Sequence, residues 1–246
     1  MAGPNGIGRS LWPAILLAWI AGTIDALGYL QLAHVFTAHM SGNAAAFGAQ
    51  LGQAQWHEVL LRILPVPAFL GGITVGAIAV RLLREGQRGR LVPAFALEFA
   101  LVVIFVLSCP PAAAIAPGSL RYAGLVWLLA AAMGVQSATL HRAGGSRIQT
   151  TFVSGMIARV ATEFGGWIVE HLIPARREGR HHGRIALVSG VIFGSFLAGA
   201  ITGGVLQARF EARGLVVPAF GLLIVIVDDL IRPAPPAAPA SEHGFE

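Results

Sequence analysis

The order of apolar and polar residues along the chain predicts a set of membrane-spanning helices. A helix that crosses a bilayer needs about 20 mostly apolar residues, with a usual range of about 17 to 25. Six stretches meet this requirement and carry few charges. They are Leu11 to Leu32, Val59 to Val80, Leu91 to Ser108, Tyr122 to Leu140, Ile185 to Leu206 and Leu215 to Ile231. Two more polar elements, near residues 35–53 and 148–173, lie between them.

The composition supports the same class of protein. Hydrophobic residues make up 55% of the 246 residues, charged residues make up 12%, and the mean hydropathy is +0.70. Soluble domains ordinarily carry about 25% charged residues. A single soluble core cannot hide so much apolar surface, so lipid is expected to cover it. Cys109 is the only cysteine, which excludes an internal disulfide and a cysteine-based metal cluster.

Three blocks of sequence recur in the same order, which indicates an internal duplication. Thr37, Ser41 and Gly42 recur 113 residues later as Thr150, Ser154 and Gly155. The second block, Phe69 to Gly76, resembles Phe196 to Gly204, and the third, Val92 to Phe95, recurs as Val217 to Phe220. The pattern predicts an all-α membrane protein with one membrane domain, residues 11–231, built from repeats 11–109 and 119–231. A segment at 1–10 precedes this domain, and a Pro-rich and Ala-rich tail at 232–246 is expected to be disordered.

The arginines predict the topology. The chain has 17 arginines and no lysine, a net charge of +5 and a pI near 10.9, and most arginines lie in loops beside helix ends. Such placement favours contact with lipid headgroups over nucleic-acid binding. If all eight elements cross the bilayer, eight arginines lie on each side; if the two polar elements re-enter, twelve lie inside and four outside. The positive-inside rule favours the second arrangement, with six spans, two re-entrant elements, both termini cytoplasmic and the second repeat inverted.

The two polar elements are the first candidates for a functional site. Each has a Ser-Gly pair after a Thr-bearing segment, in Phe36 to Gly48 and in Gln149 to Ala161, an order typical of a capped helix start. Backbone that is not helical within a bilayer must be buried in protein or line an aqueous cavity. Two such helix starts are therefore expected to meet near the midplane, with free N–H groups and positive dipole ends facing one site. The alternative is a pair of tight turns at the membrane surface.

Polar side chains inside the spans add further candidates. Asp25 lies some fifteen residues into the first span, Gln136 lies at roughly the corresponding place in the fourth, and Glu98 is a second carboxylate within a span. An ionisable group at such depth costs at least about 2.5 kcal/mol, so it is expected to face the protein interior with a functional or structural partner. The candidate solute site consists of Asp25, Thr37, Ser41, Gly42, Asn43, Gln136, Thr150, Thr151, Ser154 and Gly155. Asp25 and Glu98 are also candidates for coupling to a proton or an ion.

Other polar and small residues are expected to be structural. Arg159 and Glu163, four residues apart on one helix, predict an ion pair. Close helix packing is predicted at two glycine-rich stretches, which contain Gly71, Gly72, Gly76, Gly199, Gly203 and Gly204. The histidines lack ligand spacing and the chain has no nucleophile elbow or phosphate-binding loop, so we expect neither a metal or other cofactor nor an enzyme.

Four motifs resemble those of the YoaK-type family of bacterial inner-membrane proteins, a family of unknown function. They are A-G-T-I-D-A-L-G-Y-L from Ala21, F-T-A-H-M-S-G-N from Phe36, M-G-V-Q-S-A-T from Met133 and T-T-F-V-S-G-M from Thr150. The resemblance covers about residues 11–231. The family usually has T-G-N in the first re-entrant motif and T-G in the second, so Ser41 and Ser154 depart from it while keeping the hydroxyl. The resemblance implies a multi-pass protein of the inner membrane and supplies no substrate.

Three functions remain open on the sequence. The inverted repeat and the broken elements favour a transporter or channel for a small polar solute, by architectural analogy. A non-transporting sensor or assembly partner would instead work through the arginine-rich cytoplasmic face. An intramembrane enzyme that uses Asp25 and Glu98 has no motif in its favour. The expected partners are membrane lipids and the solute, and a homo-oligomer is compatible with all three functions.

Overall fold

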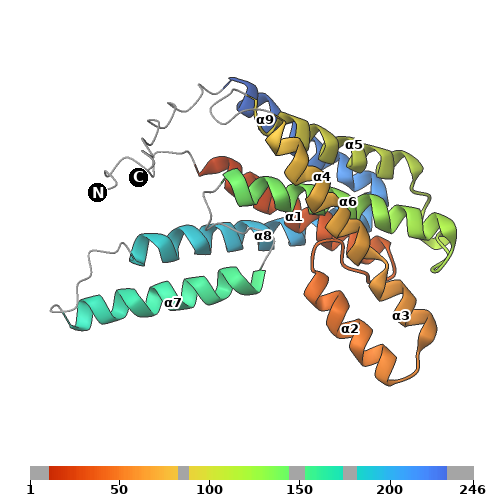
Figure 1. Ribbon diagram of the computed structural model, residues 1–246, viewed down its shortest axis with the longest axis horizontal. Coiled ribbons are helices and arrows are strands. Elements are labelled where there is room, and N and C mark those ends of the chain that lie inside the picture. The colour runs from red at the N-terminus through yellow and green to blue at the C-terminus, as the bar shows by residue number, and fades with distance from the viewer. Residues whose placement is uncertain (1–10, 83–88, 144–152, 174–181, 232–246) are drawn as a thin grey trace, which may run out of the picture.

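The computed structural model describes residues 11–82, 89–143, 153–173 and 182–231, and these residues form helices joined by short connections (Figure 1). The helices are α1 (Trp12–Gln31), α2 (Met40–Gly52), α3 (Trp56–Ile63), α4 (Pro65–Arg81), α5 (Val92–Ser108), α6 (Leu120–Ala143), α7 (Val153–Leu172), α8 (His182–Phe210) and α9 (Val216–Ile231). Short 3₁₀ turns lie at η1 (Ala112–Ala114) and η3 (Glu211–Leu215). The described residues contain no strand, which confirms the all-α class.

All six apolar stretches lie in helices. Four helical stretches are long and apolar enough to cross a membrane: Trp12–Gln31, Trp56–Arg81, Leu120–Thr139 and His182–Ile231. The last has 50 residues because only the turn η3 separates α8 from α9, and α5 is a shorter apolar helix. Large apolar side chains such as Leu107, Leu120 and Phe220 lie exposed on the outside of the bundle. Such a surface needs lipid to cover it.

Two pairs of helices run parallel in close contact. In the first pair, the Ser195 hydroxyl of α8 donates to the Ile15 carbonyl of α1 (2.7 Å), and the Thr23 hydroxyl donates to the Gly199 carbonyl (3.1 Å). The contacts advance together along both helices, so α1 and α8 run in the same direction. In the second pair, Gly72 lies against Ala131 and Gly76 against Val135, so α4 and α6 also run in parallel.

Glycines make this close approach feasible. A side-chain carbon added at Gly22 would lie 2.1 Å from the Phe196 carbonyl oxygen, and one added at Gly72 would lie 2.2 Å from that of Ala131. Equally short distances would arise at Gly199 and Gly134. Small residues allow helix backbones to pack closely within a membrane, as expected for these stretches. The expectation fails at Gly71 and Gly204, where an added carbon would meet nothing within 4 Å.

Equivalent positions make the contacts in both pairs. Gly22 of α1 contacts Phe196 of α8; Gly134 of α6, 112 residues after Gly22, contacts Phe69 of α4, 127 residues before Phe196. The same two offsets relate the contact of Gly199 with Trp19 to the contact of Gly72 with Ala131. They also relate the contact between Gly203 and Thr23 to that between Gly76 and Val135.

The first helices of the two sequence repeats run antiparallel. The Gln136 amide of α6 donates to the Leu17 carbonyl (3.3 Å), near the start of α1, whereas the Tyr122 hydroxyl donates to the Leu32 carbonyl (3.2 Å), just after its end. Because α4 runs parallel to α6, and α8 parallel to α1, α4 is antiparallel to α1 and α8 is antiparallel to α6. The chain therefore reverses direction between α1 and α4, and again between α6 and α8.

The helices α5 and α9 are joined at one end of the bundle. The carbonyl and the carboxylate of Asp229 accept hydrogen bonds from the backbone N–H groups of Gly89 (3.1 Å) and Leu91 (2.9 Å). Asp229 thus satisfies free donors at the start of α5, a role that the sequence did not predict.

Candidate functional site

The site begins at the end of α1, where the helix stops without a glycine. Ala33 and His34 have positive φ angles of 50° and 60°, the left-handed conformation that commonly ends a helix. The chain then returns alongside the last turns of α1 and reaches α2 at Met40. Asp25 lies six residues before Gln31, about 9 Å along the axis, and so is closer to the middle of α1 than to its end.

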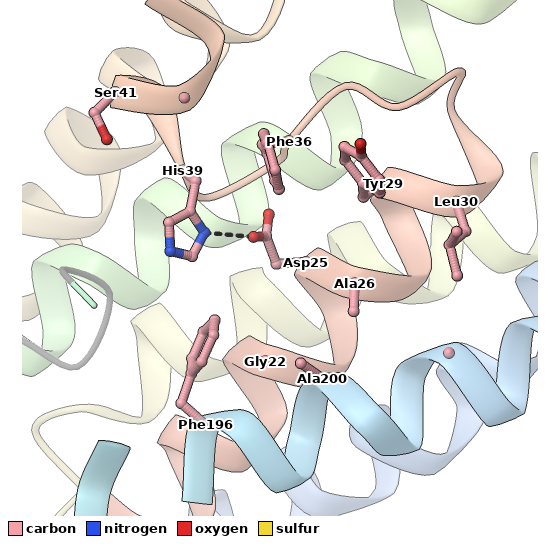
Figure 2. A pocket seen from close by; sticks show the side chains of 12 residues that line it. Gly22, Asp25, Ala26, Tyr29, Leu30, Phe36, His39, Ser41, Phe196 and Ala200 are labelled. Atoms are coloured by element: carbon pink, nitrogen blue, oxygen red, sulfur yellow. Dashed lines mark hydrogen bonds and ion pairs between the residues drawn. The ribbon is translucent and has the colours of Figure 1, made fainter. Parts of the chain in front are cut away.

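The Asp25 carboxylate holds this returning segment. Its Oδ1 accepts hydrogen bonds from the backbone N–H groups of Thr37 (2.9 Å) and Ala38 (2.7 Å) and from the Thr37 hydroxyl (3.1 Å). Its Oδ2 lies 2.5 Å from Nδ1 of His39 (Figure 2). The Asp25 side chain is 4% exposed, so its charge requires partners. The segment in turn has backbone donors that no helix satisfies, and the carboxylate supplies their acceptor.

Asn43 fixes the same segment from the α2 side. Its side-chain amide donates to the Phe36 carbonyl (2.7 Å), and its Oδ1 accepts from the Phe36 N–H (3.1 Å). Asn43 is fully buried, unlike the rest of α2, most of which is exposed or half-buried. Gly42 leaves room for the Phe36 ring, whose atoms would lie 3.2 Å from an added side-chain carbon.

The predicted helix caps are wrong in detail. The residue before α2 is His39, which makes no side-chain cap hydrogen bond, and Ser41 lies within the first turn. The helix α7 begins at Val153, so Ser154 also lies within a first turn. Asp25 accepts the N–H groups of Thr37 and Ala38, which precede α2, and so does not cap that helix.

A groove of about 440 Å³ opens beside Asp25. Its walls come from α1, from the segment before α2 and from the middle of α8, and they are mostly apolar. Ser41 and Gly42 lie at its edge, as does His39, whose side chain is 24% exposed. The lining residues are Gly22, Asp25, Ala26, Tyr29, Leu30, Phe36, His39, Ser41, Gly42, Phe196, Ala200 and Gly204.

His39 is the residue that sequence reasoning missed. Its ring lies between Phe36 and Phe196, with centroids 5.7 Å and 5.5 Å away, and Phe36 stacks on Tyr29 at 4.5 Å. The sequence analysis judged the histidines only by the spacing of metal ligands, which does not apply to His39. The one feature that could have identified His39 is its place in a polar motif between two apolar runs.

The structure brings together only part of the predicted site. Asp25, Thr37, Ser41, Gly42 and Asn43 lie around one turn of chain between α1 and α2, and their part in binding a solute stays a prediction. The predicted place of Gln136 beside Asp25 needs correction. Its side chain donates to the carbonyl of Leu17, about 12 Å along α1 from Asp25, and does not line the groove.

The second polar element contributes nothing to the described groove. Thr150 and Thr151 lie outside the described residues, and only the backbone of Ser154 is described. Gly155 is exposed on α7. A site shared between both helix starts therefore stays a prediction.

Two further acidic groups lie outside the groove. Glu98 of α5 is fully buried, and neither carboxylate oxygen has a hydrogen-bond partner among the described residues. Glu163 of α7 bonds to Nδ1 of His182 (2.7 Å), and Glu170 lies 3.8 Å from Nε2 of the same ring. These contacts join α7 to α8, and the pairing of Glu163 with Arg159 stays a prediction. The described residues contain no cluster of His, Cys, Asp or Glu that could hold a metal ion.

The helices are apolar, expose large hydrophobic side chains on the outside and pack through glycines around buried polar groups. These features define a multi-pass α-helical membrane protein. The comparisons agree with this class. The chain belongs to the DUF1275 family of proteins of unknown function, whose profile matches residues 13–227. This confirms the resemblance drawn from the four motifs.

One curated relative is the UPF0700 transmembrane protein YoaK of Bacillus subtilis (strain 168). The two sequences are 28% identical over 153 residues, which cover 61% of this chain and 65% of that protein. The match thus spans a little under two thirds of the relative. No solved structure matches the chain.

Proposed function

We propose that this protein transports a small solute across the bacterial inner membrane, through a site at the groove beside Asp25. The observation that carries the proposal is the buried Asp25 carboxylate, which holds a non-helical segment open beside an accessible groove. Transporters commonly bind their substrates where a helix is broken within the membrane. The groove lies between α1 of the first repeat and α8 of the second, so relative motion of the repeats would change access to it.

The packing supports an inverted duplication. Helix pairs α1 with α8 and α4 with α6 contact each other through equivalent residues, which is expected of two related halves. The antiparallel course of α1 and α6, the first helices of the two repeats, is expected if the halves are related by an axis in the membrane plane.

The helix directions also support the proposed topology. Because the chain reverses between α1 and α4, and between α6 and α8, the elements α2 and α7 make no net crossing. We therefore retain six spans, two re-entrant elements, both termini cytoplasmic and a single membrane domain, as arginine counting predicts. Asp25 and the unpartnered Glu98 are the candidates for proton or ion coupling. The alternative role as a sensor or assembly partner rests on loops 81–90 and 176–184, of which the structure describes only the ends.

Flux through the purified full-length protein in liposomes tests the proposal. Vesicles are loaded with a panel of small organic anions, cations and neutral polar solutes, and efflux is compared with that from empty liposomes. We expect at least one solute to move, and Asp25→Asn to slow it by ~10-fold or more, since a charge-assisted hydrogen bond is lost. Glu58→Gln, on α3 outside the groove, is the matched control and should leave flux unchanged.

Two results would contradict transport. One is the absence of flux for every solute, with the protein inserted and folded. The other is undiminished flux through Asp25→Asn. A variant that fails to fold would assign Asp25 a structural role and remove the observation on which the proposal rests.

A further inference from the structure

Asp25 and His39 form an oriented acid and imidazole pair at the groove. An ionised carboxylate can only accept hydrogen bonds, so the 2.5 Å contact requires Nδ1 of His39 to carry the hydrogen. The other ring nitrogen, Nε2, is engaged by no hydrogen bond within the described residues. Figure 2 shows Nε2 on the side of the ring away from Asp25. The carboxylate thus fixes the tautomer and leaves Nε2 as a free acceptor, as carboxylates do for histidines in many catalytic and metal sites.

Few charged or titratable groups surround His39 in the groove. Asp25 faces it from α1 and is already compensated by two backbone N–H groups and one hydroxyl. Tyr29 is the other titratable residue that lines the groove, and α8 contributes only Phe196, Ala200 and Gly204. Among the described residues that line the groove, no carboxylate other than Asp25 could pair with a cationic solute. Both oxygens of Asp25 already have hydrogen-bond partners.

A protonated His39 would make the groove attractive to an anion. When Nε2 takes a proton from water, the ring gains a positive charge and a donor at the edge of an apolar cavity. An anionic group can then accept from Nε2–H, while an apolar body lies against Phe196, Ala200 and Leu30. Burial of that body contributes about 25 cal/mol per Å² of apolar surface.

We infer that His39, positioned by Asp25, is the binding residue of this groove and that its solute is a weak organic acid with an apolar body, bound as the anion together with one proton. The balance is simple: neutral imidazole, one proton from water and one carboxylate give an imidazolium and carboxylate pair, and release reverses both steps. The inference deepens the proposed function and rests on it for its role in transport.

Binding can be measured without transport. The full-length protein in detergent is titrated with hexanoate, hexanamide and hexylamine, which share one apolar chain and differ in charge, and the midpoint of thermal unfolding is recorded. We expect hexanoate to raise the midpoint and the other two to leave it nearly unchanged. His39→Gln keeps a donor toward Asp25 but cannot take up a proton, and should weaken hexanoate binding ~10-fold or more. His34→Gln, which changes a neighbouring histidine outside the groove, is the control and also reveals any effect of the probes on the detergent.

Two pH-related readouts keep the test sharp if His39→Gln is unstable. Calorimetry at a pH where His39 is neutral in the free protein, in buffers of different ionisation enthalpy, should show close to one proton taken up per hexanoate bound to the unaltered protein. Binding should weaken as the pH rises, because a neutral His39 has no second N–H to donate to the anion.

Several results would overturn the inference. Stabilisation by hexylamine would make Asp25 a cation site, and equal stabilisation by hexanamide would make the groove a purely apolar one. No binding of any probe, or binding without proton uptake at a pH where free His39 is neutral, would also refute it. Hexanoate binding without flux of any solute would leave this inference standing and refute transport, whereas Asp25-dependent flux of other solutes without hexanoate binding would do the opposite.

Discussion

At the scale of single residues, two buried polar side chains hold a non-helical segment in place. An ionised group within a span costs at least about 2.5 kcal/mol when it is unpaired, and Asp25 avoids this cost with four hydrogen-bond contacts. Asn43 closes the segment from the other side through both groups of its amide. The path of the chain between α1 and α2 therefore depends on Asp25 and Asn43 together.

Replacement of Asn43 tests this dependence. Asn43→Ala removes a donor and an acceptor and leaves the N–H and carbonyl of Phe36 unpaired, which should lower the free energy of unfolding by about 2 kcal/mol. Hydrogen exchange should speed up at residues 35–39 and stay slow in α1 and α8. Gln53→Ala, which removes an exposed hydrogen bond to Gln55, is the control. Equal effects of the two substitutions would show that Asn43 does not hold the segment.

Sequence reasoning could identify Asp25 but not its partners. A carboxylate in an apolar run is conspicuous, and the cost of burying it predicts an inward orientation. Its partners lie 12 to 14 residues later along the chain, and their position depends on the left-handed conformations of Ala33 and His34. Alanine does not favour that conformation, and histidine, although enriched in it, adopts it too rarely to mark a turn in the sequence.

At the scale of elements, adjacent glycines provide a matched pair of substitutions. Gly72→Ala would place a methyl group 2.2 Å from the Ala131 carbonyl oxygen and force α4 away from α6, at a cost of about 1–3 kcal/mol. Gly71→Ala meets open space and should raise stability by about 0.5–1 kcal/mol, because alanine favours a helix more than glycine does. Unfolding of the full chain in mixed micelles measures both. Equal destabilisation would show that α4 and α6 are not in this register.

The elements were more predictable than their contacts. Each apolar stretch predicted a helix because a span must satisfy its own backbone hydrogen bonds. The glycine-rich stretches were recognisable as packing faces, yet only Gly72, Gly76, Gly199 and Gly203 lie against a neighbouring helix. Which glycine of an adjacent pair faces the partner depends on helix rotation, and that is set by the whole bundle. The offset of 112 residues makes Ser137 the equivalent of Asp25 in the second repeat. The sequence analysis had assigned that equivalence to Gln136, which is one residue earlier.

At the scale of the whole molecule, the groove lies between helices of different repeats. Asp25 belongs to α1, which packs through Gly22 against Phe196 and Ala200 of α8. A small movement of α8 along α1 would open or close the groove, because those two residues also line it. A transporter requires such access from both sides of the membrane in turn, whereas a receptor requires it from one side only.

The measurement that tests this account most directly is the accessibility of position 200 from each side of the membrane. A single cysteine, Ala200→Cys in a Cys109→Ser background, is exposed in sealed, oriented vesicles to a thiol reagent that cannot cross lipid. Ala198→Cys, on the exposed face of the same helix, is the control and should not react from either side. The account predicts that position 200 reacts from both sides, with a ratio that shifts when a transported solute is added. Reaction from one side only, under every condition, would contradict it.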